Sequence, residues 1–382
     1  MGAKSVETPF YRDTWVEVDL NCIYKNVQNT KRYLADGVDI IAVVKANGYG
    51  HGAYAVAQTA LAAGANALAV ALLDEALELR QKGIEAPILI LGWTRPEDVQ
   101  VAAKHHITLT VFQMEWLMSA LRFLKSNQTI DFHLKVDTGM GRIGIKEQHE
   151  ADEIMDFILE NPQFKMTGVY THFATADELD LTYFEKQYHR FITSLGWLKD
   201  RNIQVKTVHC ANSATALRFP NLNNAFNAVR LGISMYGLSP SPDIKDQLPF
   251  PLKEAFSLKS KIVHVKQLVA GERVSYGGTY EIIENEWIGT VPIGYADGWI
   301  RKLKSSEVLV NGERCPIVGR ICMDQLMISL PEQVPAGTEV VLIGKQNSEE
   351  IHIDEIAKIL DTINYEVPCM ISSRVPRIYM KM

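Results

Sequence analysis

The chain has 382 residues, of which 47% are hydrophobic, and it carries a formal net charge of -6. This composition can bury a large core, and the length favours two domains. The acidic balance and the lack of a long basic cluster argue against nucleic acid as a partner. The polar amino-terminal stretch and the short apolar runs give no sign of a signal peptide or a membrane-spanning helix. We therefore expect a soluble, cytoplasmic protein that binds neither nucleic acid nor a membrane.

The cysteines and histidines lack the spacings that bind metals or form a disulfide framework. The five cysteines are odd in number and include no C-x-x-C pair, and the ten histidines include no H-E-x-x-H motif. Structural zinc sites and disulfide scaffolds both depend on such spacings. We therefore predict no metal site and no disulfide framework.

Strand-like runs alternate with helical segments from residue 40 to residue 237. Short runs rich in apolar and β-branched residues are typical of buried strands. They occupy residues 40–45, 67–71, 87–92, 107–112, 132–137, 166–171, 205–210 and 228–235. Segments with helical periodicity, such as 74–80 and 178–199, lie between them. These eight alternations predict a (β/α)8 TIM-like barrel, with a doubly wound open sheet as the alternative.

The pattern changes after Pro240-Ser241-Pro242. Residues 257–268 alternate with a period of two, and Asn311-Gly312 is the signal of a β-hairpin. One amphipathic helix is predicted at residues 353–361. These features predict a mostly-β carboxy-terminal domain. We assign residues 14–245 to the barrel and 246–382 to the β domain, which residues 1–13 are expected to join as a terminal strand.

Lys45 is the first candidate functional residue, because it closes the first predicted strand. A flexible, glycine-rich loop is expected to follow at residues 46–52. In a barrel of this kind, functional residues collect at the carboxyl ends of the strands. A lysine amine that is partly shielded from water there can condense with a carbonyl compound. If Lys45 is considered alone, the alternative is a surface lysine at the start of a loop with no catalytic role.

The segments after the seventh and eighth predicted strands suit a phosphate group. Ser213 offers a hydroxyl, and Gly232 lets backbone N–H groups approach an anion closely. Strand eight closes against strand one in a barrel, so this site would lie near Lys45. A carbonyl cofactor with a phosphate tail fits this arrangement, which points to pyridoxal 5'-phosphate (PLP). Taken singly, both residues are also compatible with ordinary turns.

Further polar residues stand at predicted loops and turns. Arg142 follows the fifth strand in a loop with three glycines, where its guanidinium could bind a carboxylate through two hydrogen bonds. His172 follows the sixth strand, and a buried structural histidine is the alternative there. Tyr276, Tyr295 and Tyr365 stand at turns, where tyrosines commonly serve as packing residues.

Eight segments together resemble the alanine racemase family. They are AVVKANGYGHG (42–52), KVDTGMGRIG (135–144), HCANSA (209–214), VRLGISMYGL (229–238), VSYGGTY (274–280), PIGYADG (292–298), GRICMDQ (319–325) and TINYEVPC (362–369). They follow the order of the family and span nearly the whole chain. The resemblance implies a PLP-dependent homodimer with active sites shared between subunits. It also implies interconversion of L-alanine and D-alanine, which supplies D-alanine for peptidoglycan.

The resemblance assigns a role to each matching residue. Lys45 is similar to the lysine that forms a Schiff base with PLP and acts as one catalytic base. Tyr276 is similar to the opposing base, supplied by the other subunit, and Arg230 to the donor that faces the pyridine nitrogen. The other matches are Tyr49, Ser213, Gly232, Ile233 and Tyr365 (phosphate), His172 and Asn212 (cofactor), Arg142 and Met323 (substrate carboxylate), Tyr295 (entrance) and Lys135 (carbamylated in some members).

These roles agree with the chemistry of racemisation. A proton must leave one face of Cα and return to the other, which requires two bases. A guanidinium at Arg230 can donate a hydrogen bond but cannot give up its proton. The pyridine ring would then stay unprotonated and act as a weaker electron sink. We therefore expect long-lived carbanions, and the transamination that they permit, to be disfavoured.

Three other functions remain open at this stage. A barrel-type PLP amino acid decarboxylase would have an acidic partner for the pyridine nitrogen, where this chain has Arg230. A serine or broad-specificity racemase would share all the segments above. A non-catalytic PLP-binding protein would resemble the barrel alone, without the β domain that carries Tyr276.

Overall fold

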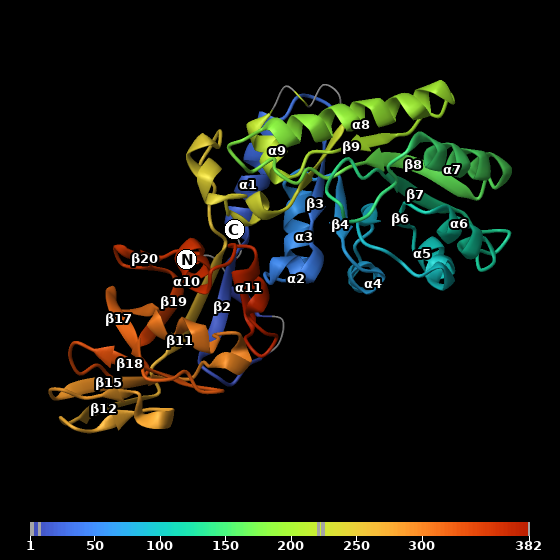
Figure 1. Cartoon of the computed structure of the whole chain (residues 1–382). Coiled ribbons are helices and arrows are strands. Elements are labelled where there is room, and N and C mark those ends of the chain that lie inside the picture. The colour runs from blue at the N-terminus through green and yellow to red at the C-terminus, as the bar shows by residue number, and fades with distance from the viewer. Residues whose placement is uncertain (1–3, 7–8, 220–221, 223–225, 381–382) are drawn as a thin grey trace. The chain divides into compact units, whose positions relative to one another are not determined.

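The computed structural model describes residues 4–6, 9–219, 222 and 226–380, which form two compact units (Figure 1). The β unit holds the described residues up to Cys22, the segment Tyr49–Gly52 and the chain from Glu254 onward. The barrel unit holds Ile23–Gly48 and Ala53–Lys253. The assignment of residues 14–245 and 246–382 to two domains, with 1–13 joined to the second, stays a prediction, because compactness alone does not show independent folding. Residues 1–3, 7–8, 220–221, 223–225 and 381–382 of these ranges lie outside the described part.

The barrel unit is a closed ring of eight parallel strands. Its order is β10-β3-β4-β5-β6-β7-β8-β9, which confirms the predicted (β/α)8 TIM-like barrel. The strands are β3 (Asp39–Val43), β4 (Ala67–Val70), β5 (Ile88–Ile90), β6 (Ile107–Val111), β7 (Ile130–Lys135), β8 (Phe164–Tyr170), β9 (Thr207–His209) and β10 (Ala228–Leu231). Strands covered on both faces read as continuous apolar runs, and for this reason the sequence located all eight.

Helices follow the strands and lie outside the ring, as Figure 1 shows for α3 to α8. They are α1 (Leu20–Tyr33), α3 (Ala53–Ala62), α4 (Leu73–Gln81), α5 (Val99–Lys104), α6 (Met114–Leu121), α7 (Gln148–Glu160), α8 (Thr182–Asp200) and α9 (Ser213–Arg218). The short element α2 (Lys45–Tyr49) has left-handed backbone angles and is not a regular helix. Short 3-10 helices are η1 (Pro96–Asp98), η3 (Ile233–Tyr236) and η4 (Pro242–Gln247).

Each predicted strand runs past the carboxyl end of the observed one, and the eighth does so by the most residues. The eighth was expected to reach residue 235, but β10 ends at Leu231 and η3 begins at Ile233. Gly232, with φ -109° and ψ -107°, turns the chain between them. The first was expected to include Lys45, but β3 ends at Val43. After β10 the run continues because Ile233–Tyr236 is buried as well, whereas after β3 only Val44 stays buried before the exposed Ala46 and Asn47.

The β unit confirms the predicted mostly-β region. Its large sheet has the order β1-β21-β2-β11-β19-β16-β17-β18-β15-β12, with β20 paired to β19, and β13 pairs with β14 separately. The strands are β1 (Lys4–Val6), β2 (Thr14–Asp19), β11 (Phe256–Lys261), β12 (His264–Leu268), β13 (Arg273–Val274), β14 (Tyr280–Glu281), β15 (Glu286–Val291), β16 (Glu307–Val310), β17 (Glu313–Val318), β18 (Leu326–Leu330), β19 (Glu339–Gln346), β20 (Glu349–Ile351) and β21 (Arg377–Met380).

The structure confirms the hairpin and the helix that were predicted in the β unit. Asn311 and Gly312 both have positive φ, at 53° and 86°, and join β16 to β17 as a two-residue hairpin loop requires. Helix α10 (Ile353–Leu360) buries its apolar face at Ile353, Ile356, Ala357 and Leu360. The alternating run predicted at 257–268 is interrupted, since β11 ends at Lys261 and β12 begins at His264.

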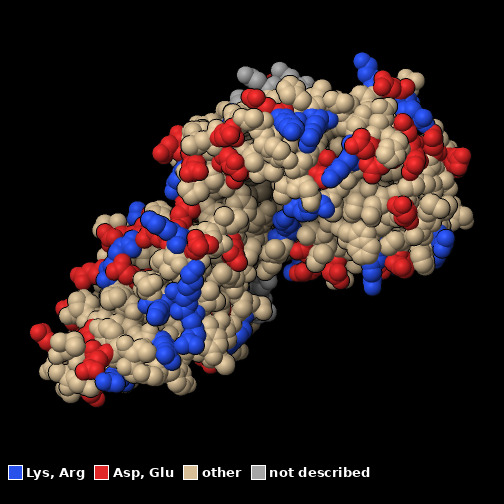
Figure 2. All heavy atoms as spheres, in the orientation of Figure 1, with Lys and Arg blue, Asp and Glu red and all other residues tan. Residues whose placement is uncertain are grey.

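The surface carries mixed charge. On the face that Figure 2 shows, acidic and basic side chains are interspersed over both units. Within the described ranges, no helix is both long and apolar enough to cross a bilayer.

Candidate functional site

Lys45 opens a strained turn instead of the flexible loop that the glycines suggested. The four residues after it have left-handed backbone angles, with φ 52° at Ala46, 51° at Asn47, 60° at Gly48 and 52° at Tyr49. A residue with a Cβ adopts this conformation at a cost of about 1–2 kcal/mol. Such strain persists only where the surroundings impose it, and it is concentrated at functional sites.

Contacts within the barrel unit impose this conformation. The Glu75 carboxylate, at the start of α4, accepts a hydrogen bond of 2.6 Å from the backbone N–H of Ala46. The Asn47 side chain accepts one of 2.9 Å from the N–H of Ala53, which begins α3. Two helix starts therefore hold the turn, and with it the backbone that carries Lys45.

Arg230 of β10 lies 3% exposed inside the barrel. Its two terminal nitrogens contact five acceptors, and all five are neutral groups. These are the His209 Nδ1 (2.7 Å), the His209 carbonyl (3.1 Å), the Thr171 carbonyl (2.7 Å), the His172 Nδ1 (3.2 Å) and the Cys210 carbonyl (3.2 Å). Nε takes no part in these bonds. These partners fix the guanidinium without neutralising its charge, which a carboxylate would do.

His172 shows that several predicted residues share one end of the barrel. Burial lowers the pKa of His172 well below its usual value, and the charges of Arg230, Arg142, Lys135 and Lys45 lower this pKa further. All four cations therefore act on the same ring. The imidazole is neutral, so its Nδ1 can accept the hydrogen bond from Arg230.

Ser213 and Gly232 lie together, as their predicted role requires. The Ser213 hydroxyl accepts a hydrogen bond of 2.9 Å from the N–H of Gly232. Ser213 opens α9 and Ile233 opens η3, so two helix starts meet here, and the first N–H groups of a helix have no partner within it. Asn212 caps α9, because its side chain accepts a bond of 3.0 Å from the N–H of Thr215. This corner of the barrel unit can bind an anion.

Lys135 of β7 is unusual among lysines, because its side chain is 2% exposed. Its Nζ donates to the Val136 carbonyl at 2.9 Å and lies 5.2 Å from the centre of the Tyr170 ring. Burial lowers the pKa of Lys135 to about 7; Arg230 and Arg142 lower it too, whereas Asp137 raises it. A substantial fraction of this amine is therefore neutral at physiological pH.

Arg142 is exposed and lies in the loop after β7, in the barrel unit. The Asp137 carboxylate accepts hydrogen bonds of 3.0 Å from the N–H groups of both Gly139 and Gly141. The hydroxyl of Tyr183 donates to the Gly139 carbonyl at 2.8 Å. The loop is thus ordered by a buried carboxylate, while its arginine stays accessible to a ligand.

Tyr49 and Tyr365 lie near each other in the β unit, with ring centres 6.2 Å apart. Arg377 holds the same segment by donating to the Gly50 carbonyl at 2.9 Å. A Cβ at Gly50 would lie 2.1 Å from the Pro368 carbonyl oxygen, so only glycine fits there. Burial raises the pKa of Tyr49, which keeps its hydroxyl protonated and able to donate.

Tyr276 is 73% exposed and begins the short helix η5 (Tyr276–Gly278) between β13 and β14. The preceding Ser275 has φ 66° and ψ -179°, a conformation found almost only in glycine. Its hydroxyl donates to the Arg320 carbonyl at 2.6 Å. A Cβ at Gly319 would lie 2.8 Å from the Cβ of Ser275. The turn that presents Tyr276 is therefore fixed against the segment 319–325.

The same segment holds the turn that carries Tyr295. The N–H of Tyr295 donates to the Cys322 carbonyl and that of Ala296 to the Met323 carbonyl, both at 3.0 Å. Tyr295 is 40% exposed and Met323 is 52% exposed. The three predicted residues Tyr276, Tyr295 and Met323 therefore occupy three interconnected loops of the β unit.

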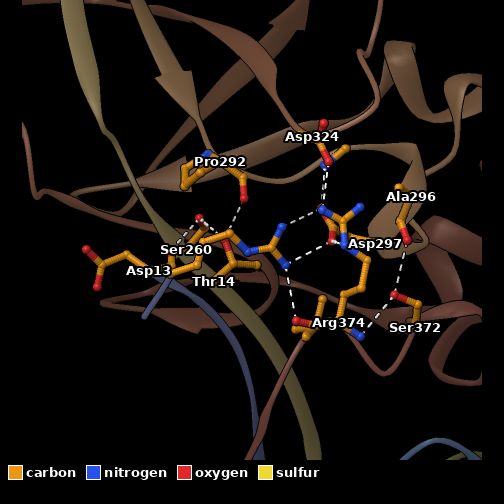
Figure 3. A network of polar contacts seen from close by, with 12 residues as sticks. Asp13, Thr14, Ser260, Pro292, Ala296, Asp297, Asp324, Ser372 and Arg374 are labelled. Atoms are coloured by element: carbon orange, nitrogen blue, oxygen red, sulfur yellow. Dashed lines mark hydrogen bonds and ion pairs between the residues drawn. The ribbon is translucent and has the colours of Figure 1, made fainter. Parts of the chain in front are cut away.

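A charge network centred on the buried Asp297 links two of these loops (Figure 3). Asp297 is fully buried and accepts two hydrogen bonds from Arg12, at 3.0 and 2.9 Å, and one of 3.0 Å from the N–H of Gly294. Arg374 lies 3.6 Å from Asp297 and donates to Asp324 at 2.7 Å. The network thus ties the turn of Tyr295 to Asp324, the neighbour of Met323.

Sequence reasoning missed His133 and His209 as parts of the site. His133 lies two residues before Lys135 in β7, so both side chains point to the same face of the strand. A polar residue at an inward position of an otherwise apolar strand is the signal that could have revealed both histidines. Among the described residues, no cluster of three or more His, Cys, Asp or Glu side chains is placed to hold a metal ion.

Comparison with known proteins shows the family of the chain. The N-terminal and C-terminal domains of alanine racemase match residues 18–240 and 255–379. The alanine racemase of Geobacillus kaustophilus (strain HTA426) is 61% identical over 372 residues, which are 97% of this chain and 96% of that protein. The crystal structure of alanine racemase from Bacillus anthracis with bound L-Ala-P has a TM-score of 0.95 and 53% identity, covering 98% of this chain and 96% of that one.

One solved structure with another substrate in its name is also similar. The histidine racemase from Leuconostoc mesenteroides subsp. sake has a TM-score of 0.91 and 31% identity, covering 99% of this chain and 100% of that one. Both family domains are present here, and relatives of high identity cover nearly every residue. The chain therefore belongs to the alanine racemase family.

Proposed function

We propose that this protein is a PLP-dependent alanine racemase that interconverts L-alanine and D-alanine. The observation that carries the proposal is Arg230, a buried guanidinium whose five acceptors are all neutral. Its charge is available to a ligand at the barrel end where Lys45 lies. The relatives named alanine racemase support the same activity. We place the enzyme in the cytoplasm, where it would supply D-alanine for peptidoglycan.

The residues present fit PLP. When bound, PLP supplies a carbonyl that condenses with amines and a ring that withdraws electrons from the substrate Cα. Nε of Arg230 would donate to the pyridine nitrogen, and His172 and Asn212 would flank the ring. The phosphate would be held by Ser213, Gly232 and Ile233 of the barrel unit and by the hydroxyls of Tyr49 and Tyr365.

Two bases would then exchange the Cα proton. The amine of Lys45 would hold the proton on one face and the phenol oxygen of Tyr276 on the opposite face. The large exposure of Tyr276 on its own chain supports a role in a site on another molecule. We propose a homodimer in which Tyr276 of one subunit completes the active site of the other.

The substrate would be a small amino acid whose carboxylate binds Arg142 and the region of Met323, with Tyr295 at the entrance. Lys135 would be carbamylated, since a neutral amine reacts with carbon dioxide and the pKa of Lys135 is lowered to about 7. A carbamate would replace a cation close to Arg142 by an anion, which would orient the guanidinium. An unchanged KM in Lys135→Ala, with no effect of added acetate or chloride, would count against this role.

A second candidate function is a racemase with another or a broader substrate range. The similarity to a histidine racemase favours this candidate, because one fold then accommodates side chains of different size. Serine and histidine are the substrates to compare with alanine. A barrel-type PLP decarboxylase fits less well, since Arg230 occupies the place of its acidic partner.

The proposal is tested by cofactor chemistry and by turnover. The purified protein should be yellow, borohydride should fix the cofactor covalently on Lys45, and L-alanine should be converted to D-alanine. A label on another lysine would refute the role of Lys45. Release of carbon dioxide from ornithine, lysine or diaminopimelate would favour the decarboxylase. A normal cofactor spectrum with no turnover would favour a non-catalytic PLP-binding protein.

A further inference from the structure

Three buried side chains form a hydrogen-bonded chain across the interior of the barrel. Nη1 of Arg230 lies 2.7 Å from Nδ1 of His209, and Nε2 of His209 lies 2.8 Å from Nδ1 of His133. All three residues are buried. Arg230 is on β10, His209 on β9 and His133 on β7. Since β8 separates β7 from β9 in the sheet, the histidines meet through the interior and not along one strand ladder.

The position of each proton in this chain follows from the guanidinium. Arg230 can only donate, so Nδ1 of His209 must be an unprotonated acceptor. A neutral His209 then carries its proton on Nε2 and donates it to Nδ1 of His133. His133 in turn carries its own proton on Nε2. Burial and the charge of Arg230 lower the pKa of His133 to about 4 and that of His209 well below its usual value, so both rings are neutral near pH 7.

The surrounding structure fixes the planes of both rings. Tyr170 of β8 stacks on His209 with ring centres 4.6 Å apart and an interplanar angle of 9°. A Cβ at Gly168 would lie 2.6 Å from the ring of His133, so only glycine fits there. The register of β7 against β8 shifts between Phe132 and His133, which brings Gly168 opposite His133. The backbone is therefore adapted to a histidine at this position.

We propose that His133 is a positioning residue for Arg230. By accepting a hydrogen bond from the Nε2–H of His209, His133 keeps the Nδ1 lone pair of His209 directed at the guanidinium. The orientation of Arg230, and the direction of its Nε–H, then depend on a residue that does not contact it. This inference depends on the proposed function in one respect, namely that Arg230 faces PLP.

Two variants of nearly equal shape distinguish the effect of the hydrogen-bond acceptor on residue 133 from the effect of its packing. In His133→Asn, Oδ1 lies the same number of bonds from the backbone as Nδ1 of histidine and can accept the same hydrogen bond. In His133→Leu, a side chain with the same branching offers no acceptor, and the N–H of His209 is left buried and unpaired. Both variants leave a similar gap beside Gly168, so the difference between them reports the hydrogen bond.

The first readout is the affinity for PLP and the absorption band of the bound cofactor. His133→Leu should bind PLP about tenfold more weakly than the wild type and shift the band, since one charge-coupled hydrogen bond is lost. His133→Asn should stay within about twofold of the wild type and keep the band. Equal affinity and equal spectra for the two variants would overturn the proposal.

The second readout does not depend on the variants or on turnover. In the full-length protein labelled with ¹⁵N-histidine, His209 should show an unprotonated Nδ1 and a protonated Nε2. A proton on Nδ1 of His209 would overturn this inference, even in a protein that binds PLP and racemises alanine. A protein with the expected protonation that binds no PLP would refute the proposed function instead, and with it the purpose of the arrangement. If His133→Leu does not fold, the wild-type spectrum and His133→Asn still decide.

Discussion

Two groups of candidate site residues, one in each unit, are held in opposite ways. In the barrel unit, Arg230, Lys135 and Ser213 are buried, and hydrogen bonds within the unit hold them. In the β unit, Tyr276, Tyr295 and Met323 project from loops and are largely exposed. The barrel unit therefore holds these polar side chains buried and in fixed positions, whereas the β unit leaves its side chains exposed on the surface. An active site completed by a second subunit would need both features: buried residues that form the site in one subunit, and exposed residues that reach it from the other.

Both units nevertheless hold a strained backbone beside the proposed base. Ala46, directly after Lys45, and Ser275, directly before Tyr276, have φ of 52° and 66°. In the barrel unit, the Glu75 carboxylate holds the strained residue from a neighbouring helix. In the β unit, the strained residue uses its own hydroxyl, which donates to Arg320. The strained residue is thus held by a side chain from a neighbouring helix in one unit and by its own side chain in the other.

The proposed division of the two bases between subunits gives the largest expected effect. Lys45→Ala and Tyr276→Phe homodimers should each lose about 10²–10⁴-fold in kcat, because each lacks one base. Refolding them together should restore activity, since a mixed dimer has one site with both lesions and one with none. With random pairing, about a quarter of all sites should be intact, measured as kcat per site.

The control for this experiment is refolding of each variant alone, with the dimer fraction measured in every sample. If mixed dimers form and the mixture stays as inactive as its parents, both bases belong to one chain. The contrast between a self-contained barrel unit and an outward-facing β unit would then have no functional meaning.

Lys135 tests how far the barrel unit tolerates a buried charge. Its pKa in the folded protein is lowered from 10.5 to about 7. Below pH 7 the Lys135 amine is protonated in both the folded and the unfolded protein. The folded protein then bears the full free-energy cost of a buried ammonium group. Between about pH 7 and pH 10 only the unfolded state keeps the proton, so the free energy of unfolding rises with pH through this group.

Lys135→Met should therefore be more stable than the wild type at pH 6, by up to about 5 kcal/mol, and this advantage should shrink as the pH rises above 7. The measurement is denaturant unfolding across pH in carbonate-free buffer. Added bicarbonate should stabilise only the wild type if Lys135 forms a carbamate. A stability difference that is independent of pH would contradict the shifted pKa.

Asp297 tests whether buried charge also supports the exposed loops of the β unit. Asp297→Asn should lower the free energy of unfolding by about 2–3 kcal/mol, because Arg12 and Arg374 lose their buried partner. The KM for alanine should rise, since the turn of Tyr295 is released. Asp324→Asn is the matched control: its side chain is 55% exposed, and it should change stability by less than about 1 kcal/mol. Equal effects of the two variants would remove Asp297 as the support of these loops.

Ser275 gives the smallest effect and tests the local contact that holds Tyr276. Ser275→Ala keeps the strained conformation and loses the hydroxyl, so stability should fall by about 1–2 kcal/mol. Ser275→Gly loses the same hydroxyl but relieves strain of about 1–3 kcal/mol. We therefore expect the glycine variant to be the more stable of the two in thermal unfolding. The reverse order, which is usual elsewhere in proteins, would show that Ser275 is not strained.

Much of the fold and many of the candidate site residues could be predicted from local patterns. The eight barrel strands are apolar runs, the Asn311-Gly312 hairpin needs two residues with positive φ, and α10 has one apolar face. The resemblance to alanine racemases rests on short segments, and these name the candidate site residues directly. Each of these signals lies within a few residues of the chain, so it can be read without knowing the neighbours in space.

Only the tertiary structure decided which residues that are distant in the sequence come into contact. Arg12 and Asp297 are 285 residues apart, and His133 and His209 are 76 residues apart. The left-handed turn after Lys45 depends on Glu75, and a glycine-rich segment by itself predicts flexibility there. Protonation states and backbone strain arise from burial and from partners brought together by folding. The sequence therefore identified the candidate site residues, and tertiary contacts decided how their charges and backbones are held.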